Sequence, residues 1–222
     1  AQIDDQAVIV VGDNVITGHT ENPSLLVEAT DNTRLISVAG ALAISEKIGI
    51  GGSAAVNTIK RQTEAIIGQR EDGSTPTLTT PGSVTATGNI LLNSKNEGFA
   101  GAFAVAGSKA SPNMTNPTSS GSPIAQTFSI SVSIGMNLVT DAGRAYFYNS
   151  TVDGAGNISL LANNETTVEA FTIGGAFAKG AKSLNLAIAG AGSSNRVDNT
   201  TEAFIKDVSS TRSRTIEAEG NI

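Results

Sequence analysis

A three-residue motif returns in this chain at nearly constant spacing. Glycine, asparagine and isoleucine follow one another at 88–90, 156–158 and 220–222, an interval of roughly 66 residues. A period of this size is typical of arrays in which a single unit cannot bury its apolar surface alone and stacks on its neighbours. The repeat therefore predicts a stacked array before any other kind of fold.

Alignment of the units without gaps places like residues in columns that follow each motif. The first block holds two apolar columns, one small-residue column and one polar column: Leu25, Ile90, Ile158 and Ile222; Val27, Leu92 and Leu160; Ala29, Ser94 and Ala162; Asp31, Asn96 and Asn164. The spacing of two places these side chains on one face of a strand. The residues of the polar column are of types that are common in turns, so we expect each of them to end its strand.

A second block of columns lies further along each unit. Its members are Ile50, Ile130 and Ile188; Asn57, Asn137 and Asn195; Ala65, Ala145 and Ala203 with Ala1; Ile67, Phe147 and Ile205 with Ile3; Gln69, Asn149 and Asp207 with Asp5. Parallel stacking would lay isoleucine over isoleucine in a continuous apolar column. The asparagine column has two interpretations, an amide ladder between stacked strands or a recurring turn residue.

These columns divide the chain into a partial unit, 1–24, and three units, 25–89, 90–157 and 158–221. Residues 108–126 are rich in Ser, Pro, Asn and Thr, and they lengthen one unit relative to the next. Fixed cores with variable loops are expected in such arrays, so this segment is interpreted as an inserted loop. We expect the chain to be part of a much longer protein.

The local pattern favours strands. Apolar and polar residues alternate over 129–136, 171–177 and 184–189, and Gly, Pro, Asn and Asp separate such runs. Residues 56–66 have partial helical spacing, which leaves a helix there as the alternative. The prediction is an all-β fold, a parallel β-solenoid (β-helix) of about three repeats with about five strands each. One wide turn per unit, with closely packed Gly- and Ala-rich sheets, is favoured over a narrow three-stranded coil.

Two phrases carry a resemblance to a known group of proteins. They are Thr201-Glu202-Ala203-Phe204-Ile205-Lys206-Asp207 and Thr63-Glu64-Ala65-Ile66-Ile67, each followed later by the Gly-Asn-Ile motif. In these features the whole chain resembles the repeat region of giant secreted bacterial β-solenoid surface proteins, the leukotoxin-like and filamentous-haemagglutinin-like adhesins. The resemblance implies an extracellular, fibre-shaped scaffold used in adhesion, without catalytic residues in its repeats.

The composition offers little for catalysis. The chain has no cysteine and one histidine, His19, which is expected in a surface loop. Residues 175–183 approach a phosphate-binding loop, but Ala181 stands where that motif needs lysine, and residues 49–54 only loosely match a dinucleotide fingerprint. We therefore predict no catalytic, cofactor-binding or metal-binding residues and no enzyme activity. Calcium bound by turn carboxylates is the alternative for Asp4, Asp5, Asp13, Asp72, Asp153 and Asp207.

The expected function is that of a structural rod or filament segment of an adhesin, outside the cell or on the bacterial surface. Its expected partners are neighbouring copies or flanking repeats and a host or surface glycan or protein ligand, with 108–126 as the candidate recognition loop. A net charge of −6 argues against nucleic acid. The longest apolar runs, 35–44 and 99–107, are too short for membrane insertion as helices. The alternative is a β-helical carbohydrate-binding or polysaccharide-cleaving domain, with Tyr146 and Tyr148 as the only tyrosines.

Overall fold

A computed structural model of the protein describes residues 1–3, 7–12, 14–19, 22–71, 82–111, 126–154, 156–180, 184–207 and 215–222. Its elements are all strands within these ranges: β1 (Gln2–Ile3), β2 (Val8–Val11), β3 (Leu25–Ser45), β4 (Ile48–Gly68), β5 (Ser83–Ala86), β6 (Ile90–Ala110), β7 (Thr127–Tyr148), β8 (Thr151–Gly154), β9 (Ile158–Ala178), β10 (Asn185–Lys206) and β11 (Ile216–Ala218).

The strands form three parallel sheets, which we number in chain order. Sheet I has the order β3-β6-β9, sheet II the order β1-β4-β7-β10, and sheet III the order β11-β8-β5-β2. Each of the ranges 25–89, 90–157 and 158–221 holds one strand of each sheet. The all-β parallel solenoid predicted from the repeat is confirmed.

The coil makes one turn per unit. Leu25 pairs with Ile90 and Ile90 with Ile158, and in sheet II the Asn57, Asn137 and Asn195 column is likewise in register. The favoured wide turn is therefore confirmed. Each unit has three strands instead of the expected five, because its two longer strands run on for 21 or 22 residues.

One local expectation was wrong: the column of Asp31, Asn96 and Asn164 does not end a strand. Residues 56–66, for which a helix was the alternative, form part of β4 as the strand prediction requires. The polar side chains of the column point into the space between the sheets, and the Asn96 amide donates to the Asn164 side-chain oxygen over 2.7 Å. Interior hydrogen bonds thus let the strand pattern continue through residues that usually mark turns.

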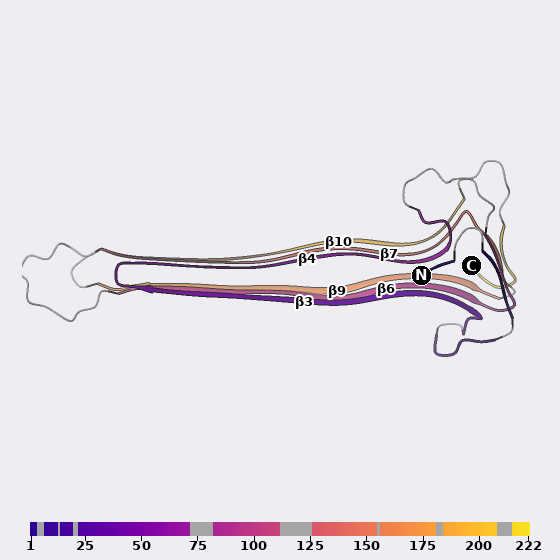
Figure 1. Ribbon diagram of the computed structural model, residues 1–222, viewed down its shortest axis with the longest axis horizontal. Helices are drawn as coiled ribbons and strands as arrows, with labels where there is room; N and C mark the ends of the chain where they lie inside the picture. The colour runs from indigo at the N-terminus through magenta and orange to yellow at the C-terminus, as the bar shows by residue number, and fades with distance from the viewer. Residues whose placement is uncertain are drawn as a thin grey trace, which may run out of the picture.

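The molecule has a broad base and a long arm (Figure 1). At the base the short strands of sheet III close a three-sided coil around an apolar core, whose fully buried members include Ile67, Val84, Ile90, Leu92, Phe147 and Val152. Beyond the base, sheets I and II run on together as two layers with nothing of sheet III between them (Figure 1). The arm is the main departure from a compact coil.

The interior of the arm admits only small side chains. Ala39, Ala55, Ala102, Ala104 and Ala170 pack together there. A Cβ atom added to Gly51 would lie 2.2 Å from the carbonyl oxygen of Gly107, and one added to Gly49 would lie 2.7 Å from that of Lys109. Because these are backbone contacts between opposite sheets, the glycines set how closely the two layers approach. The expected close packing of Gly- and Ala-rich sheets is confirmed.

The Gly-Asn-Ile motifs of successive turns are joined by hydrogen bonds. The side-chain oxygen of Asn89 accepts the backbone N–H of Asn157 over 2.7 Å, and that of Asn157 accepts the N–H of Asn221 over 2.8 Å. A Cβ atom on Gly156 would lie 2.3 Å from the Asn89 side-chain oxygen, and Gly220 stands in the same relation to Asn157. Glycine thus leaves room for the asparagine of the preceding turn.

The connections at the tip of the arm differ between units. Residues 46–47 join β3 to β4, residues 111–126 join β6 to β7, and residues 179–184 join β9 to β10. The segment expected as an inserted loop, 108–126, begins too early, because Ser108–Ala110 pair with Ala43–Ser45 inside β6. Residues 112–125 of this segment lie outside the described residues.

Serines inside the arm provide a test of its packing. The Ser131 hydroxyl is fully buried and has no hydrogen-bond partner among the described residues, whereas the Ser129 and Ser108 hydroxyls bond to each other over 2.7 Å. Ser131→Ala is expected to raise the free energy of unfolding by about 1 kcal/mol, because an unsatisfied polar group leaves the interior. Ser129→Ala is expected to lower it by about 1 kcal/mol, because the Ser108 hydroxyl loses its partner. Urea unfolding of both variants checks the pair, and equal effects would contradict it.

Candidate functional site

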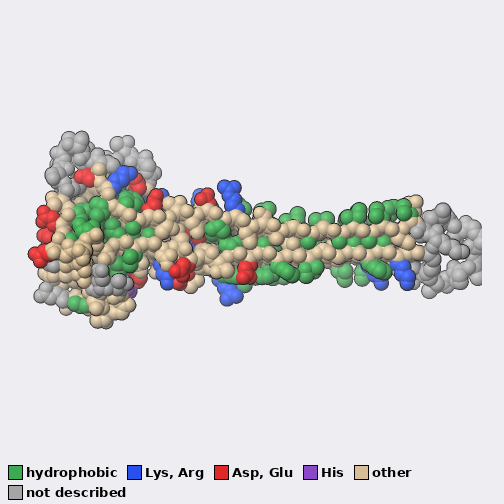
Figure 2. All heavy atoms as spheres, turned by 180° about the vertical axis from the view of Figure 1, so that it is seen from behind, with side chains coloured by type: hydrophobic (Ala, Val, Ile, Leu, Met, Phe, Trp, Pro, Cys, Tyr) green, Lys and Arg blue, Asp and Glu red, His purple; other side chains and the backbone are tan. Residues whose placement is uncertain are grey.

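The arm exposes large apolar side chains on both of its outer faces. Since the interior is filled by small residues, strand alternation directs the bulky ones outward. Figure 2 shows hydrophobic side chains along both long sides of the arm, while acidic side chains gather toward the base. An exposed apolar surface of this extent marks an interaction site in a native protein.

On sheet II the exposed side chains form one patch, which we call the sheet II face. It comprises Ile48, Ile50, Val56, Ile130, Val132, Ile134, Leu138, Leu186 and Ile188, each at least 37% exposed. The column of Ile50, Ile130 and Ile188 is present as predicted, but on this outer surface. Lys60 and Arg196 are the first outward charges toward the base on β4 and β10.

Sheet I carries a comparable patch, which we call the sheet I face. Its exposed members are Ile36, Val38, Leu42, Ile44, Val105, Phe171, Ile173 and Phe177. Lys109 and Glu169 also project from this side of β6 and β9, so the sheet I face is interrupted by charge. It also differs from the sheet II face in its aromatic content.

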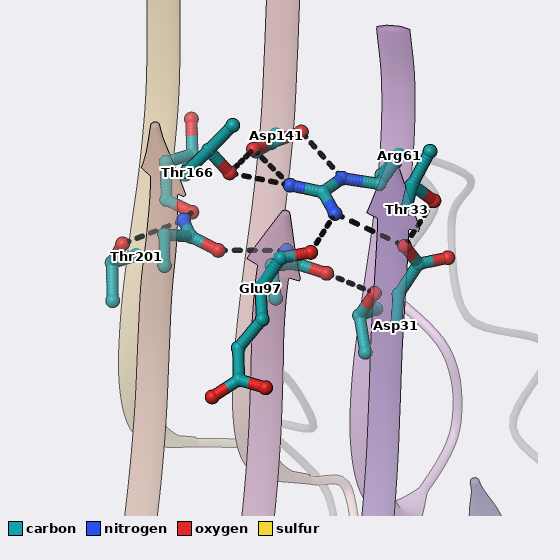
Figure 3. A network of polar contacts seen from close by, with 11 residues as sticks. Asp31, Thr33, Arg61, Glu97, Asp141, Thr166 and Thr201 are labelled. Carbon is teal, nitrogen blue, oxygen red and sulfur yellow. Dashed lines mark hydrogen bonds and ion pairs between the residues drawn. The ribbon is translucent and has the colours of Figure 1, made fainter. Parts of the chain in front are cut away.

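Where the arm leaves the base, a buried ion pair within sheet II is bonded to the strands of sheet I (Figure 3). Arg61 on β4 donates to both carboxylate oxygens of Asp141 on β7, over 2.8 and 2.5 Å. Its other terminal nitrogen donates to Asp31 on β3 over 3.1 Å and to the Glu97 carbonyl oxygen on β6 over 2.6 Å. A further bond of 2.6 Å reaches Thr166 on β9, so all five N–H groups of the guanidinium are used.

The surroundings of this pair keep both partners charged. The side chains of Arg61 and Asp141 are 5% and 0% exposed, against 39% for Asp31. Burial alone would raise the pKa of Asp141, but hydrogen bonds from Arg61 and Thr166 hold that pKa below its ordinary value. The hydrogen bond to Asp141 in turn raises the pKa of Arg61. The cluster clamps sheet I to sheet II and leaves no donor of Arg61 for a ligand.

An asparagine ladder links the layers further along the arm. The Asn57 amide donates to the Asn137 side-chain oxygen, and the Asn137 amide to that of Asn195, both over 2.8 Å. The same amides donate across the interior to the carbonyl oxygens of Gly101 and Glu169 over 2.7 Å. The ladder interpretation is confirmed, and the turn interpretation was wrong because the column lies within strands.

The two tyrosines do not provide an exposed sugar-stacking surface. The Tyr146 ring is fully buried and stacks on Phe204 at 4.6 Å between centroids, and its hydroxyl accepts the backbone N–H of Glu71. Burial raises the pKa of Tyr146 above its ordinary value. Tyr148 is 6% exposed and lies beneath Lys206. Both rings contribute to packing at the base.

The other candidate residues for catalysis or for phosphate, nucleotide or calcium binding lie far apart along the chain. His19 lies in a turn, where its carbonyl oxygen accepts the N–H of Asn22. Residues 49–54 lie in β4 and 175–178 in β9, and 181–183 are not among the described residues. Asp153 lies in β8, whereas Asp4, Asp5, Asp13 and Asp72 fall outside the described ranges. Where the chain is described, no three His, Cys, Asp or Glu side chains gather as a metal-binding group.

No protein-family model, curated protein or solved structure matches this chain. Within the described part of the chain, no helix has the length and apolarity that crossing a membrane requires.

Neither the two outer faces nor the Arg61 cluster was predicted from the residue columns. A signal for the faces was present in the alternation of Ser129, Ser131 and Ser133 with Ile130, Val132 and Ile134. The glycines at 49 and 51 indicate which half of such a pattern faces the opposite sheet. Arg61 and Asp141 share one column, but nothing in a single sequence marks them as buried.

Proposed function

We propose that this chain is a rod or filament segment of a secreted or surface-attached bacterial adhesin, and that it presents loops for adhesion or self-association. One observation carries the proposal: the strands of successive units stay in register, while the connections at the tip differ in length. A fixed scaffold with variable loops at one end is the arrangement of proteins that display binding segments. The resemblance to giant adhesins supports the same function.

The strand edges at the two ends of the coil are suited to stacking of further units. Among the described strands, β3 and β9 each pair on one side only, and along the arm so do β4 and β10. Their free backbone groups can pair with flanking repeats or with neighbouring copies. The proposed partners are therefore further units of the same kind along the coil, and a host or surface glycan or protein at the tip.

No observation specifically favours a carbohydrate-active domain. Such a domain would need exposed aromatic rings or paired carboxylates in a groove. The buried positions of Tyr146 and Tyr148 remove the two tyrosine candidates, and the exposed rings of Phe171 and Phe177 lie on the outer face of β9. The structural proposal accounts for the long arm and the variable tip, which a catalytic groove would not require.

Attachment measurements test the proposal. Beads coated with the chain are expected to adhere to host-cell monolayers, and replacing residues 112–125 by a Gly/Ser segment of equal length is expected to abolish most of that adhesion. Circular dichroism should show unchanged strand content in the variant. The control replaces residues 208–214, which join β10 to β11, in the same way and should leave adhesion unchanged. Equal adhesion of both variants, or release of reducing sugar from polysaccharides, would contradict the proposal.

A further inference from the structure

We propose that the sheet II face is the surface on which a second copy of this chain packs, sheet against sheet and related by two-fold symmetry. This inference specifies the self-association within the proposed function and rests on it. Its experiments measure oligomeric state instead of attachment, so either proposal can fail without the other.

The shape of the sheet II face is complementary to itself. On β7, Val132 and Ile134 project outward between residues with little or no side chain. In register with Val132 lie Gly52 on β4 and Gly190 on β10, and Gly192 lies beside Ile134. No atom lies within 4 Å of a Cβ built on Gly190 or Gly192. At Val132 and Ile134 the face thus has a central ridge beside shallow grooves, and a two-fold axis near these residues would place the ridge of each copy in a groove of the other.

The chemistry of the face suits burial against its own kind. From Ile48 to Val56, and over their partners as far as Met136 and Ser194, its outward residues carry no charge, and Arg196, in register with Leu138, is the first charge at the end of the face nearest the base. Packing two of these uncharged stretches together therefore leaves no charge without a partner between them. The sheet I face is the poorer candidate, because Lys109 and Glu169 would have to be buried or displaced.

The area is sufficient for a dimer. Eleven residues along three strands cover about 36 Å by 14 Å, or roughly 500 Å² per copy. Two copies would bury about 1,000 Å² in total, the lower limit for a specific protein interface.

A protein occupant is favoured over a lipid bilayer by the edges of the arm. In the described structure β4 and β10 pair only with β7 along the arm, so one side of each presents unpaired backbone groups. Hydrocarbon cannot satisfy these groups, and open sheet edges are not found in contact with lipid chains. In an aqueous dimer the same edges stay hydrated while the apolar faces meet.

Sedimentation velocity of the 222-residue chain tests the proposal. The chain is expected to form dimers at concentrations up to about 100 µM, and Val132→Lys is expected to weaken dimerisation by about 100-fold or more. Thr140→Lys adds the same charge on the same side of β7 outside the patch, and Val105→Lys adds it at the centre of the sheet I face. Both controls should dimerise like the unmodified chain. A monomeric chain, or equal weakening by Val132→Lys and Val105→Lys, would overturn the proposal.

A second measurement does not depend on the tolerance of the strand for lysine. The chain has no cysteine, so Val132→Cys and Val105→Cys each provide a single reactive thiol. A short bismaleimide is expected to link two copies through position 132 and not through position 105. Linkage through position 105 alone would overturn the assignment of the face. Co-sedimentation of the chain with phosphatidylcholine vesicles, abolished by Val132→Lys, would instead identify a lipid surface as the occupant and also overturn it.

Discussion

Asp141→Ala is expected to lower the free energy of unfolding by about 3–5 kcal/mol, because it leaves the Arg61 guanidinium buried beside an empty site. The Arg61 side chain is 5% exposed and directs two of its five donors at Asp141. Urea-induced unfolding followed by circular dichroism measures the loss. The matched variant replaces both partners, Arg61→Met with Asp141→Leu, and is expected to stay within about 1 kcal/mol of the unmodified chain, since no buried charge is left unpaired.

The same pair predicts a dependence of stability on pH. The pKa of Asp141 is lowered in the folded state, so its contribution is fully present above the unfolded pKa of about 3.9 and is lost as pH falls through the folded pKa. Below about pH 4 the free energy of unfolding should therefore fall more steeply for the unmodified chain than for the double variant. Parallel curves of stability against pH for the two proteins, or Asp141→Ala as stable as the double variant, would show that the Arg61–Asp141 pair does not stabilise the fold.

Gly51→Ala is expected to cost about 1–3 kcal/mol of stability, the usual range for overpacking a filled interior. The new Cβ would lie 2.2 Å from the Gly107 carbonyl oxygen, and this oxygen belongs to backbone held within sheet I. The layers would have to separate along the neighbouring residues of the arm.

Gly52→Ala is the control, one residue away on the outer side of β4. Its Cβ would lie 3.9 Å from the Val132 carbonyl oxygen, an ordinary contact. Its expected effect is within about 0.5 kcal/mol. Thermal unfolding of the two variants measures the difference, and similar losses at positions 51 and 52 would contradict the close approach of the sheets.

The architecture could be predicted from the columns because parallel stacking of equal turns brings like residues together. Isoleucine at 90 and 158 and asparagine at 57 and 137 stand in neighbouring strands for this reason. The number of strands could not be predicted, because Asn96 and Asn164 are usual turn residues. They become strand residues through a hydrogen bond to each other within sheet I and through bonds to Thr63 and Thr200 of sheet II.

Which side chains of the arm face its interior could not be predicted, because alternation fixes the period of a strand and not the side that faces the interior. The usual rule buries the larger apolar residues, and here Ser131 is buried while Val132 is 46% exposed. The reversal depends on the close approach at Gly51 and Gly107, a contact between strands of different sheets. Such a contact is visible only when both layers are in place.

The defining feature of the fold is one wide turn per unit, with each unit extended along the arm. A distance between spin labels at Lys47→Cys and Lys60→Cys tests it most directly, because Lys47 precedes β4 at the tip and Lys60 lies on β4 near the base. Thirteen residues of continuous strand predict a label separation of roughly 43 Å in a dipolar electron resonance measurement. A separation of about 20 Å, as in a narrow coil that folds these residues onto adjacent sides of one short turn, would contradict the account.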